Sequence, residues 1–331
     1  MTLATRYLGL SLRNPLVAGA SPLTREIGNL RRLEDLGVGA VVIPSIFEEQ
    51  IEAEDQLLES LVETGRDSYA EALTYFPVAA SYGIGPERYL EVLRRASKAV
   101  DIPVIASLNG TTNRGWIEYA CLLEEAGASA IELNIYFLPA DLKTSGREVE
   151  QRYVDILKAV KKAVKIPVAV KLGPYFSAMG HMARELDACG ADGLVLFNRF
   201  YQPDIDLARL TLLRDLALSS RNEIRLPLLW IGILAGRLKA SLAASTGVES
   251  ADEVVKYILA GADVVMTSSA LLRHGVDHAK RLLDGLKEWL KARELDGLER
   301  IRGRMSQRHL GDATAFERAN YIQILQGYRT A

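Results

Sequence analysis

Short apolar runs alternate with longer segments of helical period along most of the chain. The runs are rich in Val, Ile and Ala, and they predict eight strands, at residues 15–20, 39–44, 103–108, 130–135, 167–172, 193–197, 239–245 and 263–268. A Gly-Ala or Ala-Gly pair recurs just before a strand, as in GVGAVV and AGADVVM. Such pairs let a helix end tightly, so the alternation predicts a parallel sheet with covering helices.

Two of the intervening helices are well marked by their spacing. Residues 148–165 carry one apolar stripe, made of Val149, Tyr153, Ile156, Leu157, Val160 and Val164. We expect this stripe to lie on the sheet, because the opposite face is basic. In residues 249–261, Ser250 and Glu253 have the spacing of a capping box, and Gly261 stands where a C-terminal cap belongs.

Eight strands with helical crossovers predict a (β/α)8 TIM barrel, which typically takes about 250 residues plus insertions. We expect one domain over residues 1–331, with a barrel core at about 14–292. The residues beyond this typical length fall in an insertion after the second strand, residues 45–80, and in a C-terminal tail, residues 293–331. We expect the acidic run 48–63 to be a solvated helix face. A doubly wound open sheet is the competing architecture.

Composition narrows the choice of partner. Of the 331 residues, 49% are hydrophobic and 25% are charged, and the formal net charge is -2. This balance gives no long-range field to attract nucleic acid or anionic lipid, so we expect a small-molecule substrate and neither of those partners. Cys121 and Cys189 lie in helical patterns without CxxC spacing, which suits a reducing cytosol. Without a signal-peptide pattern or a membrane-length apolar segment, we expect a cytoplasmic protein.

Polar residues stand at the ends of three predicted strands. The fourth strand ends at Asn134, the fifth holds Lys171 just before its end, and the sixth is followed by Asn198 and Arg199. The active-site groups of a barrel come from these carboxyl ends. Each residue alone could be structural, but a buried lysine needs a negative or strongly accepting partner. We therefore expect Lys171 to contact a ligand.

The ends of the last two strands predict a phosphate site. Gly247 follows the seventh strand, and Thr267, Ser268 and Ser269 follow the eighth, each ahead of a predicted helix. The loops after strands seven and eight form the usual phosphate site of this fold. The same residues can also serve only as helix caps.

Several other kinds of site are not indicated. The sequence has no HExxH, no paired CxxC and no GxGxxG. The four histidines lie in or beside helical segments, away from the strand ends. We expect neither a metal site nor Ser-His catalysis.

Five segments together resemble the FMN-binding barrel of dihydroorotate dehydrogenases in order and spacing. They are NPLVAGAS (14–21), AIELNI (130–135), PVAVKL (167–172), Asn198 and STGVESADEVVKYILAGADVVMTSSALL (245–272). The likeness covers residues 14–275. It is greatest to the soluble class, and closer still to a divergent branch of dihydroorotate dehydrogenase-like proteins.

The resemblance implies a bound FMN and a set of residues around it. Lys171 would lie near the flavin ring, with Asn134 and Asn198 between flavin and substrate and with Ser45 beside them. The phosphate would lie among Gly247, Thr267 and Ser268, and the backbone of Ala18, Gly19 and Ala20 would support the ring. The implied reaction is hydride transfer between FMN and a CH-CH bond of dihydroorotate or a related compound. Dihydroorotate would place it in pyrimidine biosynthesis. We also expect a homodimer.

The substrate half of the site departs from the family pattern. The position of the family's proton-accepting cysteine or serine is Phe137, and an asparagine two residues further on is replaced by Pro139. Pro44 replaces a lysine at the end of the second strand, and Ser81 is at best the counterpart of another asparagine. Phenylalanine cannot accept a proton, so the catalytic base is unknown.

Three nearby residues are candidates for a replacement base: Tyr136, Lys143 and Ser145. Ser145 has a structural alternative, because it forms a capping box with Glu148. Tyrosine, with an ordinary pKa of about 10, would need a cationic neighbour to act as a base.

Two other functions of the protein remain open. One is a flavin-binding protein that has lost the family reaction, and the other is a phosphate-binding isomerase or synthase without flavin.

Overall fold

Eight parallel strands close into a barrel in the computed structural model, which describes residues 1–48, 86–110, 112–200, 202–213, 217–316 and 318–327. The strands are β3 (Leu16–Ala18), β4 (Ala40–Phe47), β5 (Val104–Asn109), β6 (Ala130–Asn134), β7 (Val168–Leu172), β8 (Gly193–Leu196), β11 (Ser241–Ala244) and β12 (Val264–Thr267). They pair in chain order, and β12 returns to β3. The predicted barrel is confirmed, and the open sheet is wrong. The second strand runs three residues beyond its predicted end, past a register shift between Val42 and Ser45.

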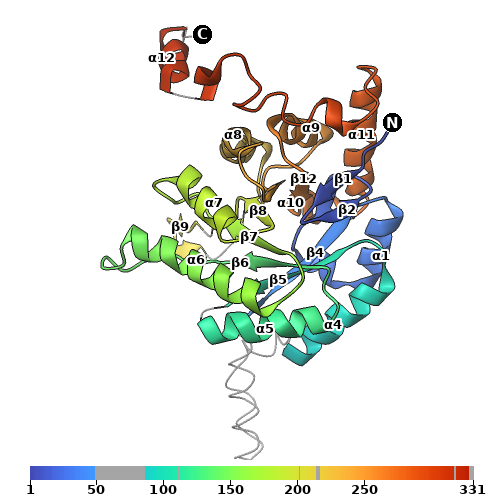
Figure 1. Ribbon diagram of the computed structural model, residues 1–331, viewed down its shortest axis with the longest axis vertical. Helices are drawn as coiled ribbons and strands as arrows, with labels where there is room; N and C mark the ends of the chain where they lie inside the picture. The colour runs from blue at the N-terminus through green and yellow to red at the C-terminus, as the bar shows by residue number, and fades with distance from the viewer. Residues whose placement is uncertain (49–85, 111, 201, 214–216, 317, 328–331) are drawn as a thin grey trace, which may run out of the picture.

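Helices follow the strands and surround the barrel (Figure 1). They are α1 (Ile27–Asp35), α4 (Pro86–Ala99), α5 (Asn113–Glu125), α6 (Gly146–Ala163), α7 (Met179–Ala188), α8 (Arg225–Leu234), α9 (Ala251–Ala260), α10 (Ser269–His274) and α11 (His278–Lys291). The predicted stripe of α6 is confirmed, since Tyr153, Ile156, Leu157 and Val160 are buried. So is the capping box of α9, which ends at Gly261 with φ 120°.

A short hairpin closes the amino end of the barrel. Its strands β1 (Thr5–Tyr7) and β2 (Leu10–Leu12) are joined by Leu8 and Gly9. Both turn residues have positive φ, as a two-residue hairpin turn requires. Tyr7 and Leu8 pack among the inward-facing residues of the barrel strands. The sequence pattern did not predict this hairpin, because three-residue strands are too short to show a period.

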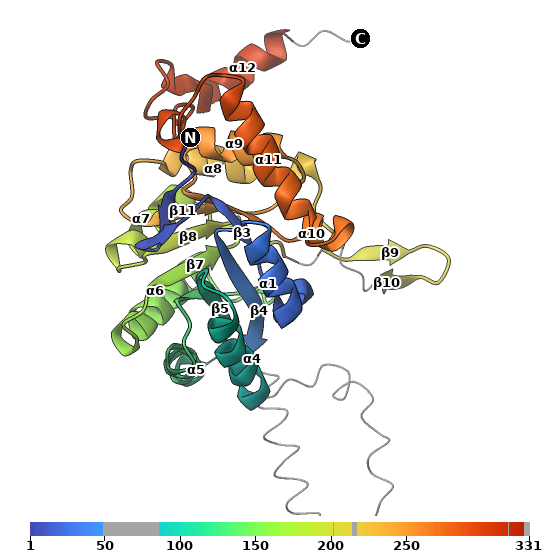
Figure 2. The same ribbon diagram turned by 90° about the vertical axis from the view of Figure 1, so that its right-hand side faces the viewer.

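A second hairpin and the C-terminal tail extend from the barrel. The hairpin strands β9 (Asp204–Asp206) and β10 (Thr211–Leu213) project from the loop after β8 (Figure 2). The tail contains the short 3-10 helices Leu298–Arg300 and Ala313–Phe316 and then α12 (Arg318–Gly327). The predicted helical extension is therefore confirmed.

The predicted insertion lies mostly outside the described residues. Only residues 45–48 of it are described, and Ser81 also falls outside. Glu48, the first residue of the acidic run, is buried rather than solvated. Its carboxylate accepts hydrogen bonds from the backbone and hydroxyl of Thr112, the N-cap of α5. A solvated face is therefore wrong for this residue, because its carboxylate anchors the end of β4 to α5.

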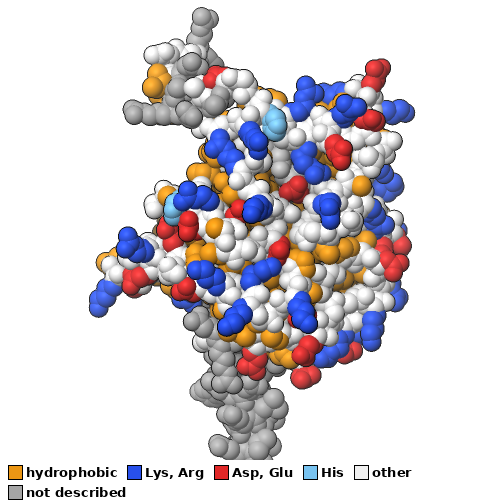
Figure 3. Space-filling model, viewed as in Figure 1, with side chains coloured by type: hydrophobic (Ala, Val, Ile, Leu, Met, Phe, Trp, Pro, Cys, Tyr) orange, Lys and Arg blue, Asp and Glu red, His pale blue; other side chains and the backbone are white. Residues whose placement is uncertain are grey.

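Charged side chains of both signs are interspersed on the face shown in Figure 3. Within the described ranges, no helix has the length and apolar character needed to cross a membrane.

Candidate active site

A cavity of about 230 Å³ opens at the carboxyl ends of the barrel strands. Six of the residues predicted to bind the cofactor line it: Ala20, Lys171, Asn198, Gly247, Thr267 and Ser268. Its wall is completed by residues from the loops after β8, β11 and β12. The fold thus brings together residues from five separate predicted strand ends.

The charge of this cavity is one-sided. Lys171 and Arg199 are among its lining residues, and none of the described lining residues is an aspartate or a glutamate. Arg199 is held by Glu223, whose Oε1 accepts a hydrogen bond of 2.8 Å from its Nε. Although Glu223 pairs with Arg199 and Glu132 with Lys171, neither acid is among the described lining residues, so an anionic ligand would meet the two cations and neither of these acids.

Lys171 forms an ion pair inside the barrel. Its Nζ lies 3.3 Å from Oε1 of Glu132 on the neighbouring strand β6. The Glu132 side chain is only 1% exposed, and its Oε2 has no hydrogen-bond partner among the described residues. The protein therefore supplies the negative partner that the burial of Lys171 requires, so burial alone does not demand an anionic ligand. Position, rather than burial, now supports a ligand role for Lys171.

The charge of Glu132 also affects the pKa of Tyr7 in the β1–β2 hairpin. Burial raises the pKa of the Tyr7 phenol well above its ordinary value, and the charges of Glu132 and Asp263 raise it further. Tyr7 therefore stays neutral beneath the ion pair.

A chain of hydrogen bonds crosses the mouth from β4 to the end of β8. The Asn198 amide donates to Asn134 Oδ1 at 2.6 Å, and the Asn134 amide donates to Ser45 Oγ at 3.1 Å. Ser45 in turn lies 2.8 Å from the hydroxyl of Ser107. These bonds fix three of the predicted residues relative to one another, although only Asn198 lines the cavity.

Hydroxyl groups gather on the opposite side of the cavity. Ser219 Oγ donates to Ser269 Oγ at 2.9 Å and accepts a longer bond, 3.4 Å, from the Gly247 amide. Gly247 has φ 74°, and a Cβ there would lie 2.9 Å from the amide nitrogen of Ile224. Only glycine fits this turn. Thr267 donates its hydroxyl to Val248, which ties β12 to the loop after β11.

The end of β3 forms the floor next to these hydroxyls. The Gly19 amide donates to the carbonyl of Thr267 at 2.9 Å. A Cβ on Gly19 would lie 2.6 Å from Ser268 Oγ. Ala18 is fully buried behind it. Small residues here bring the backbone of β3 close to the cavity.

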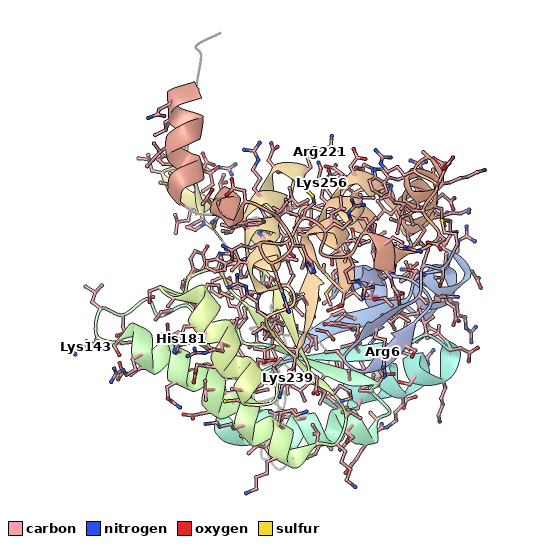
Figure 4. All side chains as sticks on the ribbon, turned by 45° about the horizontal axis from the view of Figure 1, so that its top comes forward. Arg6, Lys143, His181, Arg221, Lys239 and Lys256 are labelled. Atoms are coloured by element: carbon pink, nitrogen blue, oxygen red, sulfur yellow. The ribbon has the colours of Figure 1, made fainter. Side chains whose placement is uncertain are left out.

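The loop after β6 places the three candidate bases differently. Ser145 caps α6, accepting a hydrogen bond from the Glu148 amide. Lys143 is exposed and lies at the outer edge of the molecule (Figure 4). The Tyr136 ring instead lies 4.4 Å from that of Phe200, in the loop after β8. Of the three, Tyr136 therefore has a ring contact with the loop that carries Asn198.

The ring of Phe137 is held by a contact with α6. The Arg152 guanidinium of α6 covers its ring, with Cζ 4.3 Å from the ring centroid. This cation–π contact directs the ring toward α6.

Three residues of the site were missed or undervalued at the sequence level: Glu132, Ser219 and Ser269. Glu132 could have been found, because it precedes Asn134 by two residues and so shares its inward face. Ser219 lies in an irregular segment with no period to mark it.

The chain resembles known proteins over most of its length. A family model described as dihydroorotate dehydrogenase matches residues 2–290. The putative dihydroorotate dehydrogenase A (fumarate) of Aeropyrum pernix is 28% identical over 314 residues, covering 91% of this chain and 96% of that protein. The catalytic subunit of dihydroorotate dehydrogenase B (NAD(+)) of Methanocaldococcus jannaschii is 28% identical over 315 residues, 91% of this chain and 97% of its own. The Pyrococcus abyssi catalytic subunit of the same name is 28% identical over 313 residues.

Proposed function

The chain belongs to the dihydroorotate dehydrogenase family and is an oxidoreductase, and from that premise we propose that it binds FMN at the barrel mouth. The reaction we propose is hydride transfer between FMN and a CH-CH bond of dihydroorotate or a related cyclic carbonyl compound. The observation that carries the proposal is the cavity lined by Lys171 and Arg199, with no carboxylate among its described lining residues, beside a group of hydroxyls. When bound, FMN would accept the hydride of the oxidation or supply that of the reverse reduction.

The residues of the cavity fit this cofactor. Gly247, Ser268 and the Ser219–Ser269 pair offer amide and hydroxyl groups suited to a phosphate. Lys171 would lie beside the ring, and the backbone of Ala18, Gly19 and Ala20 would support it. Asn134 and Asn198, already hydrogen-bonded to each other, would orient the substrate carbonyl.

For the proton, we propose Tyr136. Phe137 has no proton to exchange, Ser145 is engaged as a helix cap, and Lys143 is at the outer edge of the molecule. A phenol is a weak acid and so a better proton donor than acceptor. It therefore suits reduction of an alkene next to a carbonyl, with the hydride added at one carbon and the Tyr136 proton at the other. Tyr136 is 38% exposed, so solvent can return the proton.

We also propose that the protein is a homodimer. The β9–β10 hairpin projects from the barrel, and Ile205, Leu207, Leu210 and Leu212 on it are each more than half exposed. Exposed apolar groups gathered on one projection favour burial against a partner, and a second copy presents the same surface.

The visible spectrum of the purified protein tests the proposal. We expect a flavin band, recorded anaerobically before and after adding dihydroorotate. Bleaching would assign dihydroorotate as substrate, with a group other than Phe137 taking the proton. If dihydroorotate leaves the band unbleached, the flavin is next reduced chemically. Return of the band on adding a cyclic enone would then assign a related compound as substrate. A colourless protein that takes up no FMN would contradict the proposal and favour a phosphate-binding barrel enzyme without flavin.

Two variants separate the roles of the loop. Tyr136→Phe should slow reoxidation by the enone about 100-fold, the lower end of what general acid catalysis contributes. FMN binding should be unchanged, because Tyr136 does not line the cofactor cavity. Phe137→Cys restores the family's base, and dihydroorotate oxidation gained by this variant would show that the rest of the substrate pocket is competent.

A further inference from the structure

A second cavity, of about 320 Å³, lies beside the cavity lined by Lys171 and Arg199. Its wall contains five aromatic residues from three loops and α6: Phe137, Tyr153, Tyr175, Phe176 and Phe200. Aromatic walls of this size are typical of sites for small apolar ligands. The loop that carries Phe137 in place of the family's base thus forms one side of an open aromatic cavity.

The linings of the two cavities include residues that are neighbours in the chain. Lys171 lines the first and Gly173, two residues further along, lines the second. Likewise Arg199 faces the first and Phe200 the second. Because their linings alternate along the loops after β7 and β8, the two cavities lie next to each other at the mouth of the barrel.

Ring packing holds the cavity open. Tyr175 and Phe200 lie 5.4 Å apart, and Tyr153 and Phe176 meet edge to face at 5.2 Å. A Cβ on Gly173 would lie 3.0 Å from the Phe200 ring, so glycine there leaves room for the ring. The Tyr153 hydroxyl donates to the Ile135 carbonyl at 2.8 Å, which fixes the floor.

Large apolar side chains at the rim of the second cavity are exposed to solvent, unlike those of a packed core. Tyr175 is 63% exposed and Leu138 is 62% exposed, although both are large apolar groups at the edge of a cavity. Such groups gain by covering a ligand.

The charge of the second cavity is opposite to that of the first. In the part of the chain that the structure describes, Glu150 lines it and no lysine, arginine or histidine does. Arg152 covers the Phe137 ring but is not part of the wall. A carboxylate such as that of dihydroorotate would meet an acid here and no cation, which disfavours its binding.

We propose that this cavity binds an uncharged aromatic or alicyclic group, carried by the compound whose CH-CH bond lies at the first cavity. The proposal rests on the proposed function for the identity of that compound, but the binding site itself can be tested alone. It makes the substrate larger and less anionic than dihydroorotate.

The test compares two probes with the same ring system by isothermal titration calorimetry on the full chain as purified. 2-Naphthol is neutral at pH 7, and 2-naphthoate carries a carboxylate. We expect 2-naphthol to bind at least about 10-fold more tightly, since placing a charge next to Glu150 without a cation is costly. Equal affinities for the two probes would overturn the proposal.

Variants locate the binding. Tyr175→Ala should weaken 2-naphthol about 5- to 10-fold, the loss of one aromatic contact. Tyr321→Ala on α12 is the matched control, because Tyr321 is 62% exposed against 63% for Tyr175, and it should leave the affinity unchanged. Glu150→Lys, at a helix-surface position that tolerates the change, should reverse the preference in favour of 2-naphthoate. Wild-type affinities in both Tyr175→Ala and Glu150→Lys would place the probe elsewhere and reject this site.

The two proposals fail separately. A protein that takes up no FMN but still prefers 2-naphthol would reject the flavin proposal and keep the aromatic site. A protein that binds FMN but shows no preference between the two probes would keep the flavin proposal and reject the aromatic site.

Discussion

The ion pair between Glu132 and Lys171 is the residue-level feature on which the site depends most. The Glu132 side chain is 1% exposed and Lys171 is 15% exposed, so neither charge can be solvated well if the other is removed. Removing one partner of a buried pair typically costs about 3–5 kcal/mol, whereas replacing both often costs little.

A single and a double variant test this pair. Lys171→Met should lower the free energy of unfolding by about 3 kcal/mol, measured by urea denaturation. The double variant Lys171→Met/Glu132→Gln should recover most of that loss, and both should bind FMN more weakly than the wild-type protein.

The control is an exposed pair on α11, Lys280 and Asp284, 2.9 Å apart. Lys280→Met should change stability by less than about 1 kcal/mol. An equal loss in the single and double variants would show that the two buried charges do not stabilise each other.

At the level of elements, α9 shows how a helix start is joined to the site. The Glu253 carboxylate accepts hydrogen bonds from the Ser250 amide and hydroxyl and pairs with Arg221 at 3.3 Å. Burial by itself would raise the pKa of Glu253, but these partners together lower it below its usual value. The loop before α9 carries Gly247, so this cap anchors one end of the cavity lined by Lys171 and Arg199.

The pKa of Glu253 sets the direction of a pH prediction. A carboxyl whose folded pKa is lowered stabilises the protein above its unfolded pKa of about 4.3 and ceases to do so as the pH falls through the folded pKa. Glu253→Gln should therefore cost about 1 kcal/mol at pH 7 and progressively less below about pH 4, by urea denaturation at each pH. The exposed Glu288→Gln on α11 should show no such trend, and a cost for Glu253→Gln that persists at low pH would contradict an ionic role.

At the level of the whole molecule, the projecting β9–β10 hairpin decides the oligomeric state we propose. The double variant Leu207→Asp/Leu210→Asp places charges where the apolar surface would be buried, so sedimentation velocity should show monomers where the wild-type protein is a dimer. Leu142→Asp, at a fully exposed leucine on another loop, should leave the dimer intact. Wild-type protein that is monomeric at micromolar concentration would reject the dimer.

The fold was largely predictable because its signals are local. All eight barrel strands lie where apolar runs placed them, and the caps of α6 and α9 use residues three positions apart. The two hairpins were not predicted, since strands of three residues carry too few positions to show alternation. Phe137 was identified as unable to act as a base, but its contact with Arg152 came from the structure alone.

The sequence by itself determined the barrel, the strand ends that carry Asn134, Lys171 and Asn198, and the small residues of the last two loops, because periodicity and capping act within a few residues. Only the tertiary structure decided what those ends contact. The Lys171–Glu132 pair joins residues 39 apart in the chain, and the Asn134–Asn198 bond joins residues 64 apart. The aromatic cavity likewise exists only where three loops meet. Such contacts follow from closure of the barrel, which brings distant strand ends to one mouth, and no local pattern encodes that geometry.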